Sequence, residues 1–79
     1  MSSTLLPPPR LHVVPEMSER CDRCAAAAKL TFTLPHGGGE LVFCGHHANR
    51  HTEDILRAAE RVIIENGFVW QGADRTASG

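Results

Sequence analysis

Three cysteines and one histidine are the residues of this chain whose types and spacing could perform chemistry together. Two residues separate Cys21 from Cys24, and after nineteen more residues Cys44 and His47 repeat that separation, which gives the pattern C-x2-C-x19-C-x2-H. A tight turn between the members of each pair lets both side chains face one point, so three thiolates and one imidazole can close tetrahedrally on a zinc ion. The sequence therefore predicts one zinc site.

The fourth ligand has alternatives among the neighbouring histidines. His47 is preferred because its spacing from Cys44 copies the first pair, but His46 is adjacent and His51 lies one helical turn further on. A catalytic zinc keeps a coordination position for water and needs a base nearby, as the zinc deaminases show with a glutamate. No glutamate lies beside Cys44 and His47. We therefore expect a structural zinc with four protein ligands, and a protein that is not an enzyme.

Length and composition limit the class of protein. With 79 residues there is room for a single domain. Its core is so small that we expect a bound metal to supply part of the stability of the fold. The odd number of cysteines argues against a set of disulfides and for a reducing, cytoplasmic environment. No stretch resembles a signal peptide or approaches the roughly 18 apolar residues of a membrane span, so no membrane partner is expected. The net charge of −1 does not favour nucleic acid.

Composition divides the chain into three segments. Residues 1–17 include a run of three prolines that favours an extended conformation, and we expect a flexible arm there. Within it, Leu11 to Val14 could instead pair as an edge strand. Residues 18–71 should form the zinc-binding domain. Residues 72–79, which are mostly small and polar, should form a disordered tail.

A hairpin and a helix are predicted inside the zinc-binding domain. Residues 29–34 and 40–44 are strand-like, and the glycine-rich stretch between them predicts a turn. An apolar stripe predicts a helix from about residue 46 to residue 65, with a break or kink at Thr52 and an end at Asn66-Gly67. The stripe consists of Ile55, Leu56, Ala59, Val62 and Ile63. The order of ligand pair, hairpin and helix predicts a small α+β domain of the treble-clef-like zinc-finger type, with a zinc ribbon as the alternative fold.

Parts of the sequence resemble a known family. The similar parts lie within residues 19 to 60, and they include Cys21-Asp22-Arg23-Cys24-Ala25-Ala26-Ala27, the strand Leu30 to Leu34, Gly37-Gly38-Gly39-Glu40-Leu41 and Phe43-Cys44-Gly45-His46-His47-Ala48. They are similar to the small, uncharacterised zinc-ribbon-like domain proteins of actinobacteria and their phages. The resemblance implies a cytoplasmic protein of a bacterium or of a bacteriophage-infected cell. It also implies metal binding by Cys21, Cys24, Cys44 and His47, and it implies no activity.

A protein–protein interaction module is the function that we expect. Zinc would shape a small scaffold that presents the helix and the apolar end of the domain to an unidentified protein partner. Phe68 and Trp70 are the candidate partner-binding residues, because tryptophan is over-represented among interface hot spots. The alternative is that residues 68–70 fold back and fill the small core.

Other functions remain open at this stage. A nucleic-acid-binding zinc finger of the kind used in transcription is favoured by basic residues near the first cysteine pair and on the predicted helix, namely Arg20, Arg23, Lys29, Arg50, Arg57 and Arg61. It is opposed by the acidic net charge and by the absence of aromatic residues among these bases. An HNH-type nuclease is suggested by the run from His46 to His51, although that fold places its histidines and asparagine on separate elements. The predicted helix is also apolar on more than one side. Either residues 11–14 or a second chain must then cover it, so a homodimer is a further possibility.

Overall fold

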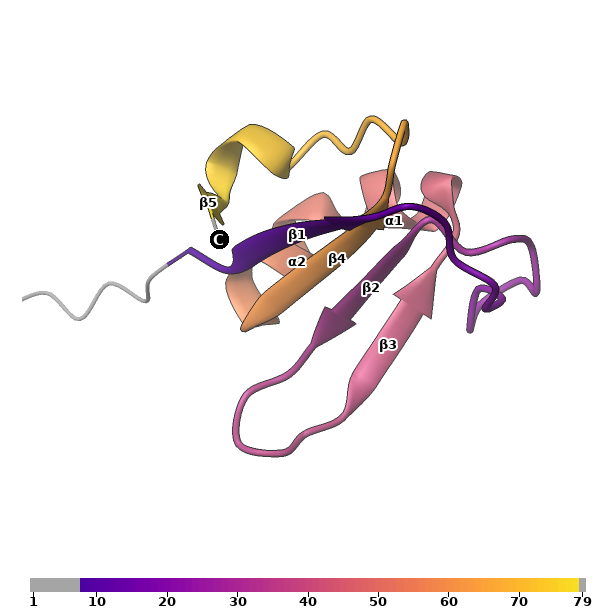
Figure 1. Ribbon diagram of the computed structural model, residues 1–79. Coiled ribbons are helices and arrows are strands. Elements are labelled where there is room, and N and C mark those ends of the chain that lie inside the picture. Colours follow the sequence, from indigo (N-terminus) through magenta and orange to yellow (C-terminus); the bar gives the residue numbers. More distant parts are fainter. Residues whose placement is uncertain (1–7, 79) are drawn as a thin grey trace, which may run out of the picture.

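A mixed sheet with two short helices on one face forms the fold. The computed structural model describes residues 8–78 (Figure 1). The strands β1 (Arg10–Val14), β2 (Leu30–Thr33), β3 (Glu40–Phe43), β4 (Arg61–Glu65) and β5 (Ala77–Ser78) lie in the order β3-β2-β4-β1-β5. β2 runs antiparallel to β3 and β4, whereas β1 is parallel to β4 and β5. The helices α1 (Gly45–Arg50) and α2 (Thr52–Ala58) connect β3 to β4, and the 3-10 helix η1 (Ala73–Arg75) precedes β5.

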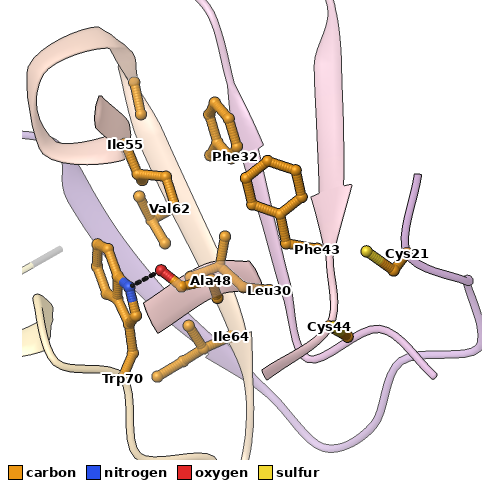
Figure 2. Close-up of a cluster of buried hydrophobic side chains, with 11 residues drawn as sticks. Cys21, Leu30, Phe32, Phe43, Cys44, Ala48, Ile55, Val62, Ile64 and Trp70 are labelled. Carbon is orange, nitrogen blue, oxygen red and sulfur yellow. Dashed lines mark hydrogen bonds between the residues drawn. The ribbon is translucent and has the colours of Figure 1, made fainter. Parts of the chain in front are cut away.

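The core lies between the sheet and the helices. Alternation along the central strands turns Leu30 and Phe32 of β2 and Val62 and Ile64 of β4 toward the helices, and all four are buried. Ala48 of α1 and Ile55 of α2 meet them from the other side (Figure 2). Cys21 and Cys44 belong to the same buried cluster as these apolar side chains. The core and the cysteine cluster are therefore continuous.

The hairpin is confirmed, and so is the break near Thr52. β2 and β3 pair in register from Leu30 opposite Phe43 to Thr33 opposite Glu40. The two helices are separated at His51, whose backbone leaves helical geometry with φ −105° and ψ 25°. The hydroxyl of Thr52 donates to the carbonyl oxygens of Ala48 and Asn49, at 3.2 and 2.9 Å. These bonds satisfy carbonyls that the end of α1 leaves without a helical partner.

The prediction of one helix as far as residue 65 is wrong beyond Ala58. The backbone becomes extended at Ala59, with φ −83° and ψ 142°, and Arg61–Glu65 form β4 at the centre of the sheet. Three consecutive β-branched residues, Val62 to Ile64, favour a strand over a helix because their side chains are restricted in a helix. The helix available to cover the core is therefore much shorter than expected.

The N-terminal and C-terminal segments also differ from the expectation. Residues 10–14, assigned to a flexible arm, form the inner strand β1 between β4 and β5, and Leu11 packs against the core. The segment after residue 72, expected to be disordered, contains η1 and β5. The expectations for residues 1–7 and for Gly79 lie outside the described residues. Among the described residues, no helix has the length and apolar character needed to cross a membrane.

Candidate metal centre

The first ligand pair lies in a turn formed by residues 20–27, which we call the cysteine turn. Arg20 and Ala27 form a β-bridge at its base, and the amide of Cys21 donates to the carbonyl oxygen of Ala26 at 2.8 Å. Ala25, at the tip, has a left-handed backbone with φ 65° and donates to the carbonyl oxygen of Cys21 at 2.9 Å. These contacts bring the thiols of Cys21 and Cys24 to the same side of the turn.

The second pair lies where β3 passes into α1. Cys44 is the extended residue before the helix, with φ −75° and ψ 176°, and its sulfur accepts the backbone N–H of His47 at 3.5 Å. His47 therefore lies in the first turn of α1, and its imidazole is on the same side as Cys44. Its Nδ1 lies 3.3 Å from Cys44 Sγ. Gly45 allows a close approach here, because a Cβ atom at that position would lie 3.0 Å from the ring of Phe68.

The four donor atoms have the separations of a tetrahedral metal site. The Sγ atoms of Cys21, Cys24 and Cys44 and a ring nitrogen of His47 all lie within 4.8 Å of one another. Cys24 Sγ is 3.7 Å from Cys44 Sγ, and Cys21 Sγ is 3.5 Å from His47 Nδ1. Tetrahedral zinc would require sulfur–sulfur separations of about 3.8 Å and sulfur–nitrogen separations of about 3.6 Å. These two pairs are close to those values, and the widest pair would need to shorten by no more than about 1 Å, so these residues could hold a metal ion after small side-chain movements.

Hydrogen bonding favours the thiolate form of Cys21. Burial raises the pKa of this thiol, but hydrogen bonds from the backbone of Arg23, Cys44 and Cys24 outweigh burial and lower the pKa overall. The Arg23 amide lies 3.4 Å from the sulfur. For Cys24, the backbone of Ala26 lowers the pKa, but burial and the sulfurs of Cys44 and Cys21 outweigh it and raise the pKa. A second thiolate beside the first needs a compensating cation.

His47 is held in the neutral form that binds metals. Burial lowers the pKa of its imidazole, and the electrostatic influence of the neighbouring His46, His51, Arg23 and Arg50 lowers it further. A neutral imidazole offers a nitrogen lone pair, whereas the protonated ring offers none.

The neighbouring histidines do not join the cluster. The ring of His51 stacks on that of His47 with centroids 6.2 Å apart, and its Nδ1 lies 3.8 Å from the carboxylate of Asp54. His46 is exposed, and the centroids of the His46 and His47 rings lie 5.3 Å apart in an edge-on arrangement. Of the three histidines considered from the sequence, the structure therefore brings His47 to the three sulfurs.

Replacing His47 should test this selection directly. We expect His47→Ala to weaken metal binding by at least about 100-fold, since it removes one of four donors. His46→Ala is the matched control and should leave the affinity within about twofold, because it removes an adjacent imidazole that lies outside the cluster. Competition with a chromophoric chelator would measure both affinities. Equal losses in the two variants, or a larger loss in His51→Ala, would refute the assignment.

Asp22 fastens the cysteine turn to the hairpin, a role that the sequence did not reveal. Its carboxylate accepts the N–H of Val42 at 2.9 Å, and its own amide donates to the Val42 carbonyl at 2.8 Å. Val42 lies on β3, so both outward-facing backbone groups of this edge residue are satisfied by the cysteine turn. The two ligand pairs are thus held in register by a contact outside the metal cluster.

Substitution of Asp22 should loosen this contact without removing a ligand. Asp22→Ala should lower the free energy of unfolding by about 1 kcal/mol and speed amide hydrogen exchange at Val42, because it removes an acceptor from an exposed hydrogen bond. Asp22→Asn keeps a side-chain oxygen and should lose less. Chemical denaturation together with exchange measured by NMR would check both. Unchanged protection of Val42 in Asp22→Ala would show that the contact is not maintained in solution.

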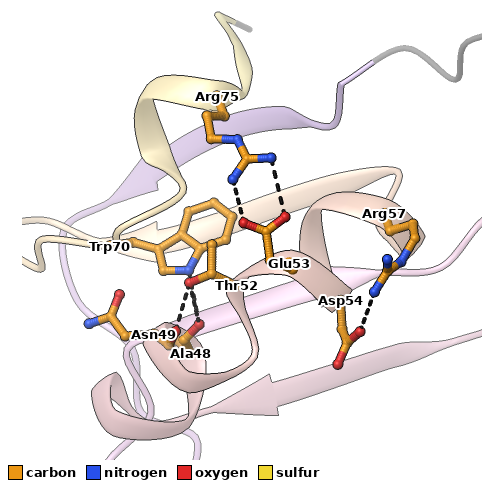
Figure 3. A network of polar contacts seen from close by, with 8 residues as sticks. All are labelled: Ala48, Asn49, Thr52, Glu53, Asp54, Arg57, Trp70 and Arg75. Atoms are coloured by element: carbon orange, nitrogen blue, oxygen red, sulfur yellow. Dashed lines mark hydrogen bonds and ion pairs between the residues drawn. The ribbon is translucent and has the colours of Figure 1, made fainter.

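The two candidate partner-binding residues lie at different depths. Trp70 is only 2% exposed, and its indole N–H donates to the carbonyl oxygen of Ala48 at 3.0 Å (Figure 3). Phe68 is half-buried and packs against the core cluster. The prediction that Trp70 is a partner-binding residue at the surface is therefore wrong. The alternative, in which residues 68–70 fold back and fill the core, describes the position of Trp70. Val69, between them, is 83% exposed.

A groove lies beside the metal centre, and we call it the side groove. Its volume is about 350 Å³, and most of its lining is apolar. The cysteine turn, the hairpin and α2 all contribute to its walls. The lining residues are Arg23, Phe32, Leu34, Leu41, Phe43, His51, Asp54, Ile55 and Ala58. The sequence did not reveal this groove, because the residues that form it come from three separate segments.

Residues 15–69 of the chain match a family that is described as a domain of unknown function (DUF7455). The match includes both ligand pairs, the hairpin, the two helices and β4. A protein of Micromonospora echinospora named "Calichemicin antitumor antibiotic biosynthesis protein" is 57% identical over 30 residues, which cover 38% of this chain and 94% of that protein. No solved structure matches the chain significantly.

Proposed function

The chain belongs to the DUF7455 family of domains of unknown function, and we propose that it is a zinc-organised scaffold that binds another protein. The metal would be held by Cys21, Cys24, Cys44 and His47. Its contribution would be to cross-link the cysteine turn to the start of α1. The order of cysteine turn, hairpin and helix supports a treble-clef-like arrangement of the site.

Zinc is the metal that this donor set favours. Thiolate ligands select soft or borderline metals, and three sulfurs with one imidazole in tetrahedral positions are a typical structural zinc set. The cluster also continues directly into the apolar core through Cys21 and Cys44. A metal there would stabilise the core of a chain that is otherwise small.

The role that we propose for the metal is structural and not catalytic. Four protein donors fill a tetrahedral shell, whereas a catalytic zinc keeps one position for water or substrate. Thiolates that accept backbone N–H groups, as Cys21 and Cys44 do, are held in fixed orientations. We accordingly propose no enzymatic activity and no HNH-type chemistry for the chain.

The observation that carries the binding function is the side groove. The groove has a volume of about 350 Å³ and a mainly apolar lining, and a partner that covered this lining would remove apolar surface from water. Two of the arginines expected on the predicted helix are poorly placed for a nucleic-acid surface by comparison. Arg57 is paired with Asp54 at 2.6 Å, and Arg61 belongs to β4 and not to the helix. The basic stripe expected along one helix is thus divided among separate elements.

Reconstitution with purified components would test the proposed function. We expect the zinc-loaded protein to form a complex of fixed stoichiometry with a partner protein isolated from its own cells, and to lose that complex when a chelator removes the metal. Binding should change little between low and physiological salt, because the contact is mainly apolar. Instead, retention of DNA or RNA that weakens steeply over that range would favour the nucleic-acid-binding alternative and contradict the proposal.

A further inference from the structure

The side groove is open because the helices cover only part of the sheet. α1 and α2 span six and seven residues, and the segment after β4 packs near the opposite edge, where β5 joins β1 (Figure 1). β3 is the other edge strand. Its side chains on the helix face therefore have no helix fully over them, and Leu41 is 38% exposed. The floor of the groove is formed by the buried residues Phe32, Phe43 and Ile55 (Figure 2).

The charges at the rim of the groove are unequal. The carboxylate of Asp54 is bonded to Arg57 at 2.6 Å and lies 3.8 Å from His51, so its charge is balanced within the chain. Arg23 stands on the cysteine turn at the same groove and is exposed. None of the ion pairs formed by the described residues includes it. The rim therefore offers one exposed cation that forms no ion pair with the described residues, beside an apolar floor.

At Val42, the edge of β3 does not offer the backbone groups that an added strand would need. The outward N–H and carbonyl of Val42 are both taken by Asp22. An extended peptide could not continue the sheet past this point without displacing the cysteine turn. A segment bound here must therefore be recognised through its side chains.

We propose that the side groove binds a short segment of a partner protein that carries apolar side chains next to an acidic residue. The apolar side chains would fill the space between Leu41 and Ile55, and the carboxylate would pair with the guanidinium of Arg23. Arginine suits this role because its planar fork binds a carboxylate through two hydrogen bonds. The inference rests on the proposed function and specifies the chemistry of the partner.

A peptide array can test this inference on the zinc-loaded protein. The probes are synthetic 12-residue peptides in three classes, namely apolar with acidic, apolar with basic, and acidic without apolar residues. We expect retention of the first class, with affinity reduced about 30-fold by Leu41→Ser and about tenfold by Arg23→Gln. Val69→Ser is the matched control, since it alters an exposed apolar residue outside the groove, and it should bind as the unmodified chain does. Metal content measured for each variant shows that the site is intact.

The possible outcomes separate the two proposals. Peptides of the first class that bind equally well to Leu41→Ser and Arg23→Gln but not to Val69→Ser would overturn the side groove while leaving a protein-binding function. Preference for apolar peptides with basic residues would overturn the role of Arg23. Retention of no peptide class would overturn the inference. Sedimentation could instead show self-association that Leu41→Ser abolishes. That result would also overturn the inference, because the groove would then bind a second copy of this chain. Salt-sensitive retention of nucleic acid alone would contradict the proposed function as well.

Discussion

Replacing Cys24 by serine should abolish metal binding and cooperative unfolding together. Cys24 is the exposed member of the three cysteines, so the substitution removes a donor without removing a buried core side chain. Structural zinc contributes about 10–16 kcal/mol in small domains, which equals or exceeds the roughly 5–15 kcal/mol of net stability of an ordinary protein. The variant should therefore lack a folded state at room temperature, and a chelator should have the same effect on the unmodified chain.

Ala26→Ser is the matched control for this prediction. It places a serine at an exposed position in the same turn but leaves all four donors in place. It should retain one metal ion per chain and a melting temperature close to that of the unmodified chain. Metal analysis combined with circular dichroism during heating would measure both properties. A Cys24→Ser protein that melts cooperatively at the original temperature would show that the cluster does not maintain the fold.

Replacing Trp70 by alanine should destabilise the metal-loaded protein by about 3–5 kcal/mol, because the substitution empties a large buried site. The indole contacts the junction of α1 and α2, where its N–H and the hydroxyl of Thr52 both donate to Ala48. Gly72 closes over the ring, since a Cβ atom there would lie 2.8 Å from it. The C-terminal segment should therefore detach from the helices in this variant. Urea denaturation in excess zinc would measure the loss.

Val69→Ala serves as the control, because Val69 is the neighbouring residue and is 83% exposed. It should change the free energy of unfolding by no more than about 0.5 kcal/mol. Trp70→Phe should fall between the two, since it keeps most of the apolar volume and loses the donor to Ala48. Equal stability of the alanine variants at 69 and 70 would place the indole outside the core. That result would restore Trp70 as a candidate for partner binding.

The metal cluster and the hairpin could be predicted from the sequence because both depend on local patterns. Two residues between Cys21 and Cys24 fix a turn, and strict alternation from Leu30 to Leu34 fixes a strand, whatever the rest of the chain does. His47 could be ranked above His46 and His51 for the same reason. The structure agrees that these four donors come together.

The central strand β4 could not be separated from the helix by periodicity alone. Val62 follows Ile55 and Ala59 at helical spacing, so the stripe continues by coincidence into a segment that is extended. Parallel pairing of β1 with β4 joins residues about fifty positions apart, and no local pattern encodes such a contact. The run of β-branched residues from Val62 to Ile64 was the available indication of a strand.

The prediction that Trp70 binds a partner, when it is in fact buried in the core, followed from these two errors in the predicted fold. A helix reaching residue 65 would have placed residues 68–70 beyond the end of the domain. Because the chain turns back into β4 after Ala58, the segment that follows β4 returns to the same end of the sheet as α1 and can reach Ala48. Asp22 and Arg23 were recognised as part of the ligand motif, but their contacts depend on where β3 lies and are not local in sequence.

X-ray absorption at the zinc edge of the purified, metal-loaded protein tests the site most directly. We expect three sulfur neighbours at about 2.3 Å and one nitrogen neighbour at about 2.0–2.1 Å, as four protein donors require. The same sample should contain one zinc ion per chain. A shell of four sulfur neighbours, a spectrum without the outer-shell scattering of a coordinated imidazole ring, or a well-folded protein that contains no bound metal would contradict the four-ligand structural site.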